Sequence, residues 1–457
     1  MTTPHNPLSN ETAHVAMDVP HEGTRLRQLV NGRRLKRLAG VFSAQMLVQL
    51  FGFMAGLLLV REMAPVDYGH YTALMTLVGV GAVMLDLGLS AAMLSLGGPH
   101  HAQPAPLAHL LADACRLQWR LTAWLALPLA GGGVVLLREQ GLLPGHAVAL
   151  VLLCLAVSVL NARNAVAVAV LRLRGDVALH QRLELGVNLA RLAVVAGATL
   201  GHIDLALAAF TMAVPSILMT IALGRALHAP PDAVDVADAM GAAAGVFDGR
   251  LRSAVRLQAP NSMYYCLSGQ LPVLLVAWFG HTQQVAEVGA LGRLALLFTV
   301  VGSVLAALVM PYFARPRRAA ELRGAFLFLN ALFLGLTLLL ALVALTVPTA
   351  LLSVLGPKYL HLAPEALWMV LSASLAAWSG ALYSIGAARG WVPRGWLVIP
   401  VGVATLAMAV VLVDVSTVAG AFQISTAAGA SATLLMAGFV GLRLRRHIAT
   451  QGPGAVA

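Results

Sequence analysis

Apolar runs of about 20 residues, the length needed to cross a bilayer, recur along this chain and limit its fold more than any other feature. Charged residues make up only 11% of the sequence, against about 25% in soluble proteins, so a soluble fold is excluded. Backbone amides in hydrocarbon must be hydrogen-bonded within their own segment, and the alternating pattern of barrel strands is absent. The sequence therefore predicts an all-α polytopic membrane protein with twelve transmembrane helices. The predicted spans are 38–60, 71–96, 121–137, 145–171, 183–200, 203–226, 257–280, 286–313, 325–354, 361–388, 395–413 and 417–442.

The distribution of Lys and Arg tests this helix count. With the N-terminus inside, 24 of the 30 Lys and Arg residues fall on the cytoplasmic side, and the outer loops hold only Arg61, Arg138 and Lys358. This asymmetry obeys the positive-inside rule, and one missed helix would destroy it. Most of the net charge of +11 is thus explained by orientation. We expect a multi-pass protein with both termini in the cytoplasm.

The spans divide into two sets of six around a long internal loop. We predict a basic, disordered cytoplasmic tail at 1–37, a six-helix lobe at 38–226, a cytoplasmic linker at 227–256, a second six-helix lobe at 257–442 and a cytoplasmic tail at 443–457. Two parallel halves of this kind occur in transporters. A short internal similarity supports the repeat, because Gly69 and Gly289 each lie at the start of the second helix of a half.

Ionisable residues inside spans are costly and point to functional sites. Arg163, Arg191 and Arg293 lie within predicted spans and make the interior more cationic than anionic. Arginine stays charged when buried and binds phosphate through two nitrogens, so these residues predict an anionic, phosphate-bearing substrate. Asn261 and Gln49, on polar faces of their helices, are further candidate substrate-binding residues.

Acidic residues inside the spans provide candidates for ion coupling. Asp86 and Glu184 could couple transport to H⁺ or Na⁺, or they could pair structurally with Arg163 or Arg191. The Asn, Gln and Ser side chains could equally serve as interhelical hydrogen-bonding groups.

Motifs for other activities are missing. The sequence contains no P-loop, no nucleophile elbow and no H-E-x-x-H motif, so we expect neither ATP hydrolysis nor another enzyme activity. Its three cysteines show no metal-binding spacing, and we expect no disulfide, metal or other cofactor. The basic residues from Arg25 to Arg37 suit anionic membrane lipids better than nucleic acid.

Three pairs of motifs, in the correct helix order, resemble bacterial polysaccharide flippases of the Wzx type. They are Val60–Tyr71 with Leu85–Ser90, Val288–Leu294 with Val309–Arg315, and Leu355–Tyr359 with Ala387–Gly390. These flippases belong to the MOP superfamily, beside MATE drug exporters and lipid II flippases. The resemblance implies two lobes around a cationic cavity, with Arg293 at a basic position that is common in that helix.

The resemblance also implies a function. Such proteins move undecaprenyl-diphosphate-linked oligosaccharide across the bacterial inner membrane for O-antigen or exopolysaccharide synthesis, alongside polysaccharide polymerases and chain-length proteins. We expect alternating access, with the lipid tail remaining in the bilayer. The alternatives are a MATE-type small-molecule exporter and, from a different class, a glycan polymerase or ligase of the same pathway. The short outer loops argue against the polymerase or ligase.

Overall fold

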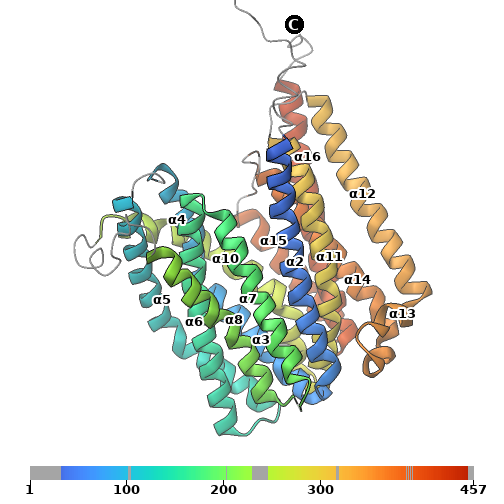
Figure 1. Ribbon diagram of the computed structural model, residues 1–457. Helices are drawn as coiled ribbons and strands as arrows, with labels where there is room; N and C mark the ends of the chain where they lie inside the picture. The colour runs from blue at the N-terminus through green and yellow to red at the C-terminus, as the bar shows by residue number, and fades with distance from the viewer. Residues whose placement is uncertain are drawn as a thin grey trace, which may run out of the picture.

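The computed structural model describes residues 32–100, 104–201, 203–228, 245–314, 319–387, 389, 391, 393 and 395–450. Within these residues every regular element is a helix, which confirms the predicted all-α class (Figure 1). The predicted tail 1–37 lies mostly outside the described residues, as do residues 229–244 of the predicted linker and residues 451–457. The elements are α2 (Gly32–Glu62), α3 (Pro65–Asp86), α4 (Leu89–Gly97), η1 (Gly98–His100), α5 (Pro104–Glu139), α6 (Pro144–Arg174), α7 (Val177–Ala198), α8 (Leu205–His228), α10 (Asp248–Phe279), α11 (Thr282–Ala314), α12 (Ala319–Thr346), α13 (Pro348–Ser353), η2 (Pro357–Glu365), α14 (Ala366–Ala387), α15 (Gly395–Leu412) and α16 (Val418–Thr450).

Ten helical segments among the described residues are long and apolar enough to cross a membrane. Helix α7 is not among them, since it carries Arg182, Glu184 and Arg191 within one short helix. One predicted span, 71–96, is broken where Leu87 and Gly88 adopt positive φ, so that α4 begins as a separate helix. Pro residues begin α3 and α6, where a missing backbone N–H costs nothing.

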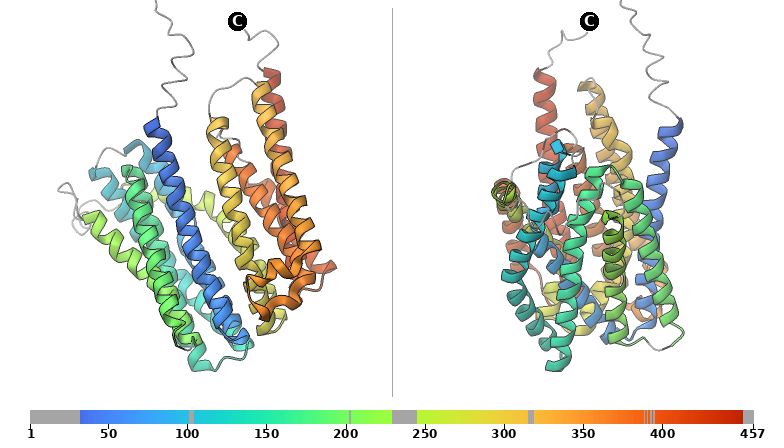
Figure 2. Two further views of the ribbon diagram at one scale, coloured as in Figure 1. Left: turned by 45° about the vertical axis from the view of Figure 1, so that its right-hand side comes forward. Right: turned by 60° about the vertical axis from the view of Figure 1, so that its left-hand side comes forward.

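The helices form two lobes that meet at one end and separate at the other (Figure 2). One large buried core joins residues of both lobes, from Ala55 and Tyr68 to Leu355 and Phe422. Two smaller cores are separate: one lies among α4, α5, α6 and the start of α10, and the other among α12, α14 and α16. We call the joined end the closed end and the opposite one, where α2 begins and α16 ends, the terminal end.

Helix α10 belongs to both lobes. It begins at Asp248, earlier than the predicted span at 257, and its first turns place Phe247, Leu251 and Val255 in the core with α4, α5 and α6. The buried Asp113 carboxylate of α5 accepts hydrogen bonds from the Phe247 and Gly245 amides at 2.9 and 3.2 Å. The far end of α10 lies in the joined core through Val276 and Ala277.

Close backbone packing holds the closed end together. A Cβ atom at Gly69 would lie 2.2 Å from the Thr282 carbonyl oxygen, and one at Gly289 would lie 2.3 Å from Thr72 Oγ1. Only glycine fits at such distances. Gly69 and Gly289, which occupy equivalent positions in the two halves of the sequence, therefore allow α3 and α11 to approach each other across the lobes.

Reciprocal polar contacts add to this packing. Lys358 Nζ donates to the carbonyls of Arg61 and Met63 at 2.8 and 3.0 Å. In the opposite direction, Arg61 Nε donates to the Val354 carbonyl at 2.9 Å. Each lobe thus places a cation on the backbone carbonyls of the other.

Candidate functional site

Two arginines converge on a pair of buried tyrosines near the closed end. Tyr68 and Tyr71 of α3 are fully buried, with ring centroids 6.0 Å apart. Arg293 of α11 points its Nε at the Tyr68 hydroxyl at 3.4 Å, and Arg191 of α7 donates from Nη2 to the Tyr71 hydroxyl at 3.2 Å. The arginines come from opposite lobes and meet where the lobes meet.

No carboxylate among the described residues forms an ion pair with either arginine. Glu287, the acid nearest to Arg293 in sequence, instead contacts His361 at 2.9 Å and accepts from Gln283 at 3.3 Å. Arg191 Nε is buried without a hydrogen-bond partner among these residues. Two partly buried positive charges therefore lie here without the neutralising acids that such burial ordinarily requires.

Helix α2 lies between α7 and α11, the two helices that carry these arginines (Figure 1). A Cβ atom at Gly56 would lie 3.2 Å from the Arg293 side chain, and one at Gly52 would lie 3.7 Å from Asn188 Oδ1. Gln49 is exposed. It lies on the same face of α2, about one turn before Gly52 and two turns before Gly56. The predicted residue Gln49 thus stands on the arginine-facing side of α2, toward the terminal end.

A cavity of about 930 Å³ separates the lobes on the terminal side of this cluster. Val83 and Ala91 line it from one lobe, while Ser379 and Tyr383 line it from the other. Asn261 of α10 also lines it, and its Oδ1 is buried without a hydrogen-bond partner among the described residues. The cavity is large enough for a ligand of drug size or more.

A pocket within the first lobe gathers the charged and amide side chains of α6 and α7. It has a volume of about 300 Å³, and Arg191, Glu184 and Asn188 line it. The Glu184 carboxylate lies 3.7 Å from His180 Nε2, which lines the same pocket. Asn161 and Asn164 of α6 bond to α8, accepting from Ser216 and Thr220 at 2.7 and 3.0 Å, and so serve as interhelical contacts.

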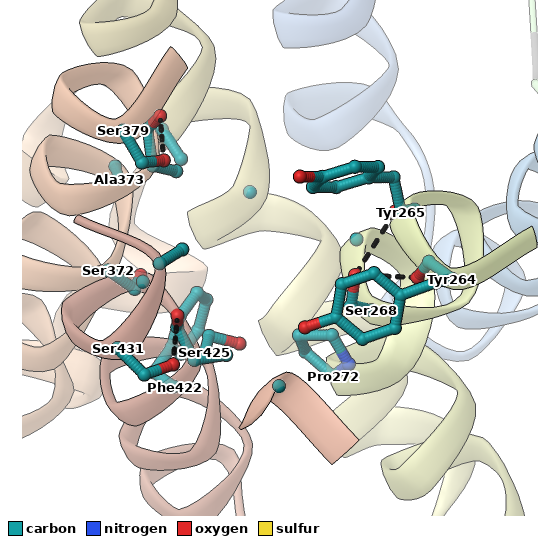
Figure 3. Close-up of a pocket in the computed structure, with 18 of the residues that line it drawn as sticks. Tyr264, Tyr265, Ser268, Pro272, Ser372, Ala373, Ser379, Phe422, Ser425 and Ser431 are labelled. Carbon is teal, nitrogen blue, oxygen red and sulfur yellow. Dashed lines mark hydrogen bonds between the residues drawn. The ribbon is translucent and has the colours of Figure 1, made fainter. Parts of the chain in front are cut away.

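A pocket within the second lobe is lined by hydroxyl and apolar groups. It has a volume of about 430 Å³ and lies among α10, α11, α14, α15 and α16. Figure 3 shows Ser372, Ser425 and Ser431 on one wall, opposite Tyr264 and Ser268 on the other. It shares Tyr265 and Ser379 with the cavity between the lobes, so the two spaces are adjacent.

Two of the predicted site residues lie away from this region. Arg163 is exposed, and its guanidinium lies over the Trp119 ring of α5 at 5.5 Å. Asp86 accepts hydrogen bonds from the Ser90 amide and hydroxyl at 3.1 and 2.9 Å. It thereby stabilises the start of α4, a role that explains the acid without ion transport.

Sequence reasoning missed the tyrosine pair and two of the pocket serines. Tyr68 and Tyr71 belong to a motif that carries the family resemblance. Their spacing of three residues at the start of an apolar helix is the one feature of the sequence that could have predicted a shared face. Ser425 and Ser431 lie on α16 within a run of Ala, Gly and Thr residues, where nothing in the sequence distinguishes a pocket-lining serine from a packing residue.

Comparisons with known proteins show the fold. No family model and no curated protein matches the sequence. Among solved structures, an inward-facing multidrug resistance MATE family transporter of the MOP superfamily is similar with a TM-score of 0.62, at 14% identity over 88% of this chain and 95% of that one. The chain has a MATE-like fold.

Other MATE structures agree. The eukaryotic MATE transporter AtDTX14 is similar at 13% identity, with a TM-score of 0.56 over 92% of this chain and 99% of that one. An outward-facing MATE family transporter gives a TM-score of 0.59 at 14% identity, over 90% of this chain and 94% of that one. With its apolar helices, this MATE-like fold supports the prediction of a multi-pass membrane protein.

Proposed function

We propose that the protein transports undecaprenyl-diphosphate-linked oligosaccharide across the bacterial inner membrane, for O-antigen or other surface polysaccharide synthesis. The observation that carries this proposal is the pair Arg191 and Arg293, which hold positive charge between the lobes without acidic partners among the described residues. A diphosphate would supply the missing negative charge, and arginine binds phosphate through two nitrogens.

The arrangement also supports a route. The cavity between the lobes is lined by Val83, Asn261 and Tyr383 among others, and neither arginine is among its lining residues. In this proposal the head group passes from this cavity to the arginines, and the closed end blocks the opposite side. In this proposal the terminal end is cytoplasmic, as the distribution of Lys and Arg predicts. The diphosphate enters from the cytoplasm and binds the arginines, and the lipid tail stays in the bilayer. The lobes then close at the terminal end and open at the other end, and the head group is released outside.

Ion coupling is assigned in this proposal to Glu184 rather than Asp86. Glu184 lines the same pocket as Arg191 and lies 3.7 Å from His180, so a change in its protonation would change the charge beside the arginine. H⁺ or Na⁺ would be the coupling ion. We propose no catalytic step and no other cofactor. The polymerase and chain-length proteins of the pathway and anionic lipids would be partners, but nucleic acid would not.

The main alternative is a MATE-type small-molecule exporter, which has the same fold. Its two-lobed architecture would fit the solved relatives equally well. A transporter of cationic drugs would be expected to place acids in the cavity between the lobes. The residues described as lining that cavity include neither an acid nor a base, so its lining is not the cationic one that the resemblance implied, and the case for an anion rests on Arg191 and Arg293. The charge of the preferred substrate therefore separates the two functions.

Reconstitution into liposomes tests the proposal. The assay measures translocation of fluorescent undecaprenyl-diphosphate N-acetylglucosamine by the wild type and by Arg293→Ala, with uptake of a cationic dye as the rival activity. We expect lipid translocation to fall at least about tenfold in Arg293→Ala, because a charge-assisted contact of about 1.5–3 kcal/mol is lost. Arg163→Ala is the matched control and should keep wild-type activity. Dye uptake without lipid translocation, or full activity in Arg293→Ala, would refute the proposal.

A further inference from the structure

Five serine hydroxyl groups line the pocket of the second lobe. Ser372, Ser379, Ser425 and Ser431 each donate their hydroxyl hydrogen to a carbonyl of their own helix, at 2.9–3.0 Å. Ser268 on the opposite wall does the same toward the Tyr264 carbonyl at 2.7 Å. The five hydroxyl groups have therefore used their donors within the protein, while their oxygen lone pairs are free to accept.

The pocket is also electrically neutral. Among the described residues that line it there is no Asp, Glu, Lys, Arg or His. A cation would find no carboxylate here, and a phosphate would find no guanidinium or ammonium group. The complementary ligand is uncharged and rich in hydrogen-bond donors.

Aromatic side chains supply a second kind of contact. Tyr264 and Tyr265 pack edge to face with ring centroids 5.3 Å apart, and Phe422 lies on the opposite wall (Figure 3). Aromatic rings offer large apolar surfaces at fixed orientations. The C–H faces of a sugar ring pack on such surfaces while its hydroxyls point to the sides. The volume of about 430 Å³ falls within the range of small-molecule sites.

The pocket is close to the proposed diphosphate site. Gly292 and Ala295 of α11 line it, and Arg293 lies between them in the chain and points toward Tyr68. Arg293 is turned by about 100° around α11 from Gly292 and by about 200° from Ala295, so its side chain leaves the same turn of the helix on another face. A diphosphate at Arg293 would leave the first sugars of its head group within reach of the serines.

We propose that this pocket, with its acceptor hydroxyls and aromatic walls, binds the uncharged sugars next to the diphosphate. The inference rests on the proposed function and assigns the glycan to the pocket between α10 and the helices of the second lobe. It further implies that the sugars nearest to the lipid are neutral, since no side chain lining the pocket could match a carboxylate or an ammonium group.

Binding to the full-length protein in nanodiscs tests this inference. The probes are undecaprenyl diphosphate and undecaprenyl-diphosphate N-acetylglucosamine, compared for the wild type and for the double variant Ser372→Ala, Ser425→Ala. We expect the wild type to bind the glycosylated lipid about tenfold more tightly, as two hydrogen bonds would allow. The double variant should lose this difference and bind the unglycosylated lipid as the wild type does. Alanine is the strongest helix former, so the helices should be preserved.

Two further variants separate the possible failures. Ser384→Ala on α14 removes a hydroxyl that makes the same kind of backbone contact, to Gly380 at 2.9 Å, but does not line the pocket. It should keep the full preference for the glycosylated lipid. Arg293→Ala should weaken binding of both lipids alike. If Arg293→Ala has no effect while the sugar preference persists, the diphosphate assignment fails and the pocket assignment stands. A sugar preference that survives in the double variant, or is absent in the wild type, overturns the pocket assignment.

Discussion

The two lobes are alike in their helical construction, yet their internal pockets differ in chemistry. The first lobe surrounds about 300 Å³ with Glu184, His180 and Arg191. The second surrounds about 430 Å³ with serines, tyrosines and apolar groups, and no charged side chain lines it. On the proposed function, this contrast would let the lobes divide one substrate, with the diphosphate held where the lobes meet and the neutral sugars in the pocket of the second lobe.

The largest expected effect comes from placing a charge in the neutral pocket. Ser425→Asp should reduce translocation of the diphosphate-linked sugar about 100-fold, because an unpaired carboxylate in a pocket without cations is costly and repels the anionic lipid. Ser425→Asn is the control of equal size and should retain much of the activity. Equal activity of the two variants in the liposome assay would show that neutrality is not what distinguishes this pocket.

Neutralising the acid of the first lobe should have the next largest effect. In Glu184→Gln we expect the stimulation of transport by a proton or sodium gradient to disappear, while binding of undecaprenyl diphosphate is retained. The reason is that the amide keeps the shape of the side chain but cannot change its charge. Transport rates measured with and without each gradient check this. A variant that still responds to the gradients would move the coupling away from the first lobe.

A smaller effect is expected at the tyrosine pair. Tyr71→Phe removes the hydroxyl that accepts from Arg191 at 3.2 Å, and the guanidinium then loses one of its fixed contacts. We expect about a threefold loss in affinity for undecaprenyl diphosphate, at the lower end for a hydrogen bond. Titration in nanodiscs measures it. Unchanged affinity would mean that Arg191 is positioned by other groups.

The smallest effect on transport is expected at Asp86. Asp86→Ala should lower the free energy of unfolding by about 1 kcal/mol, the usual contribution of a helix cap. Thermal unfolding in detergent would detect this, and the ion dependence of transport should be unchanged. A lost ion response in Asp86→Ala would contradict the structural role and would weaken the assignment of coupling to the first lobe alone.

The sequence predicted the fold class well because bilayer-length apolar runs and the positions of Lys and Arg are properties of the chain itself. The MATE-like fold agrees with those predictions. Arg191 and Arg293 can also be singled out in the sequence, since a charge inside an apolar run is visible without a structure. Their role in substrate binding stays a prediction.

The sequence could not show in which direction individual side chains point. Arg163 follows Asn161 by two residues, which turns it by about 200° around α6, so the two cannot share a face. Asn161 points to Ser216 of α8, while Arg163 points to Trp119 of α5. The role of Tyr68 depends on Arg293, 225 residues away, and such pairings arise only in the folded protein. Asp86 can bond to the start of α4 only because the helix breaks at Leu87, and the sequence did not predict this break.

The contacts between Arg61, Lys358 and opposing backbone carbonyls have a consequence for kinetics. A carbonyl has no proton to gain or lose in the physiological range, and no ion pair among the described residues spans the closed end. As the lobes separate, water can replace each carbonyl as the hydrogen-bond acceptor of the cation. Separation of these contacts would therefore leave no buried carboxylate without a partner. These contacts should therefore contribute little pH dependence to the opening of this end, and a pH-dependent turnover would report other groups or another step of the cycle.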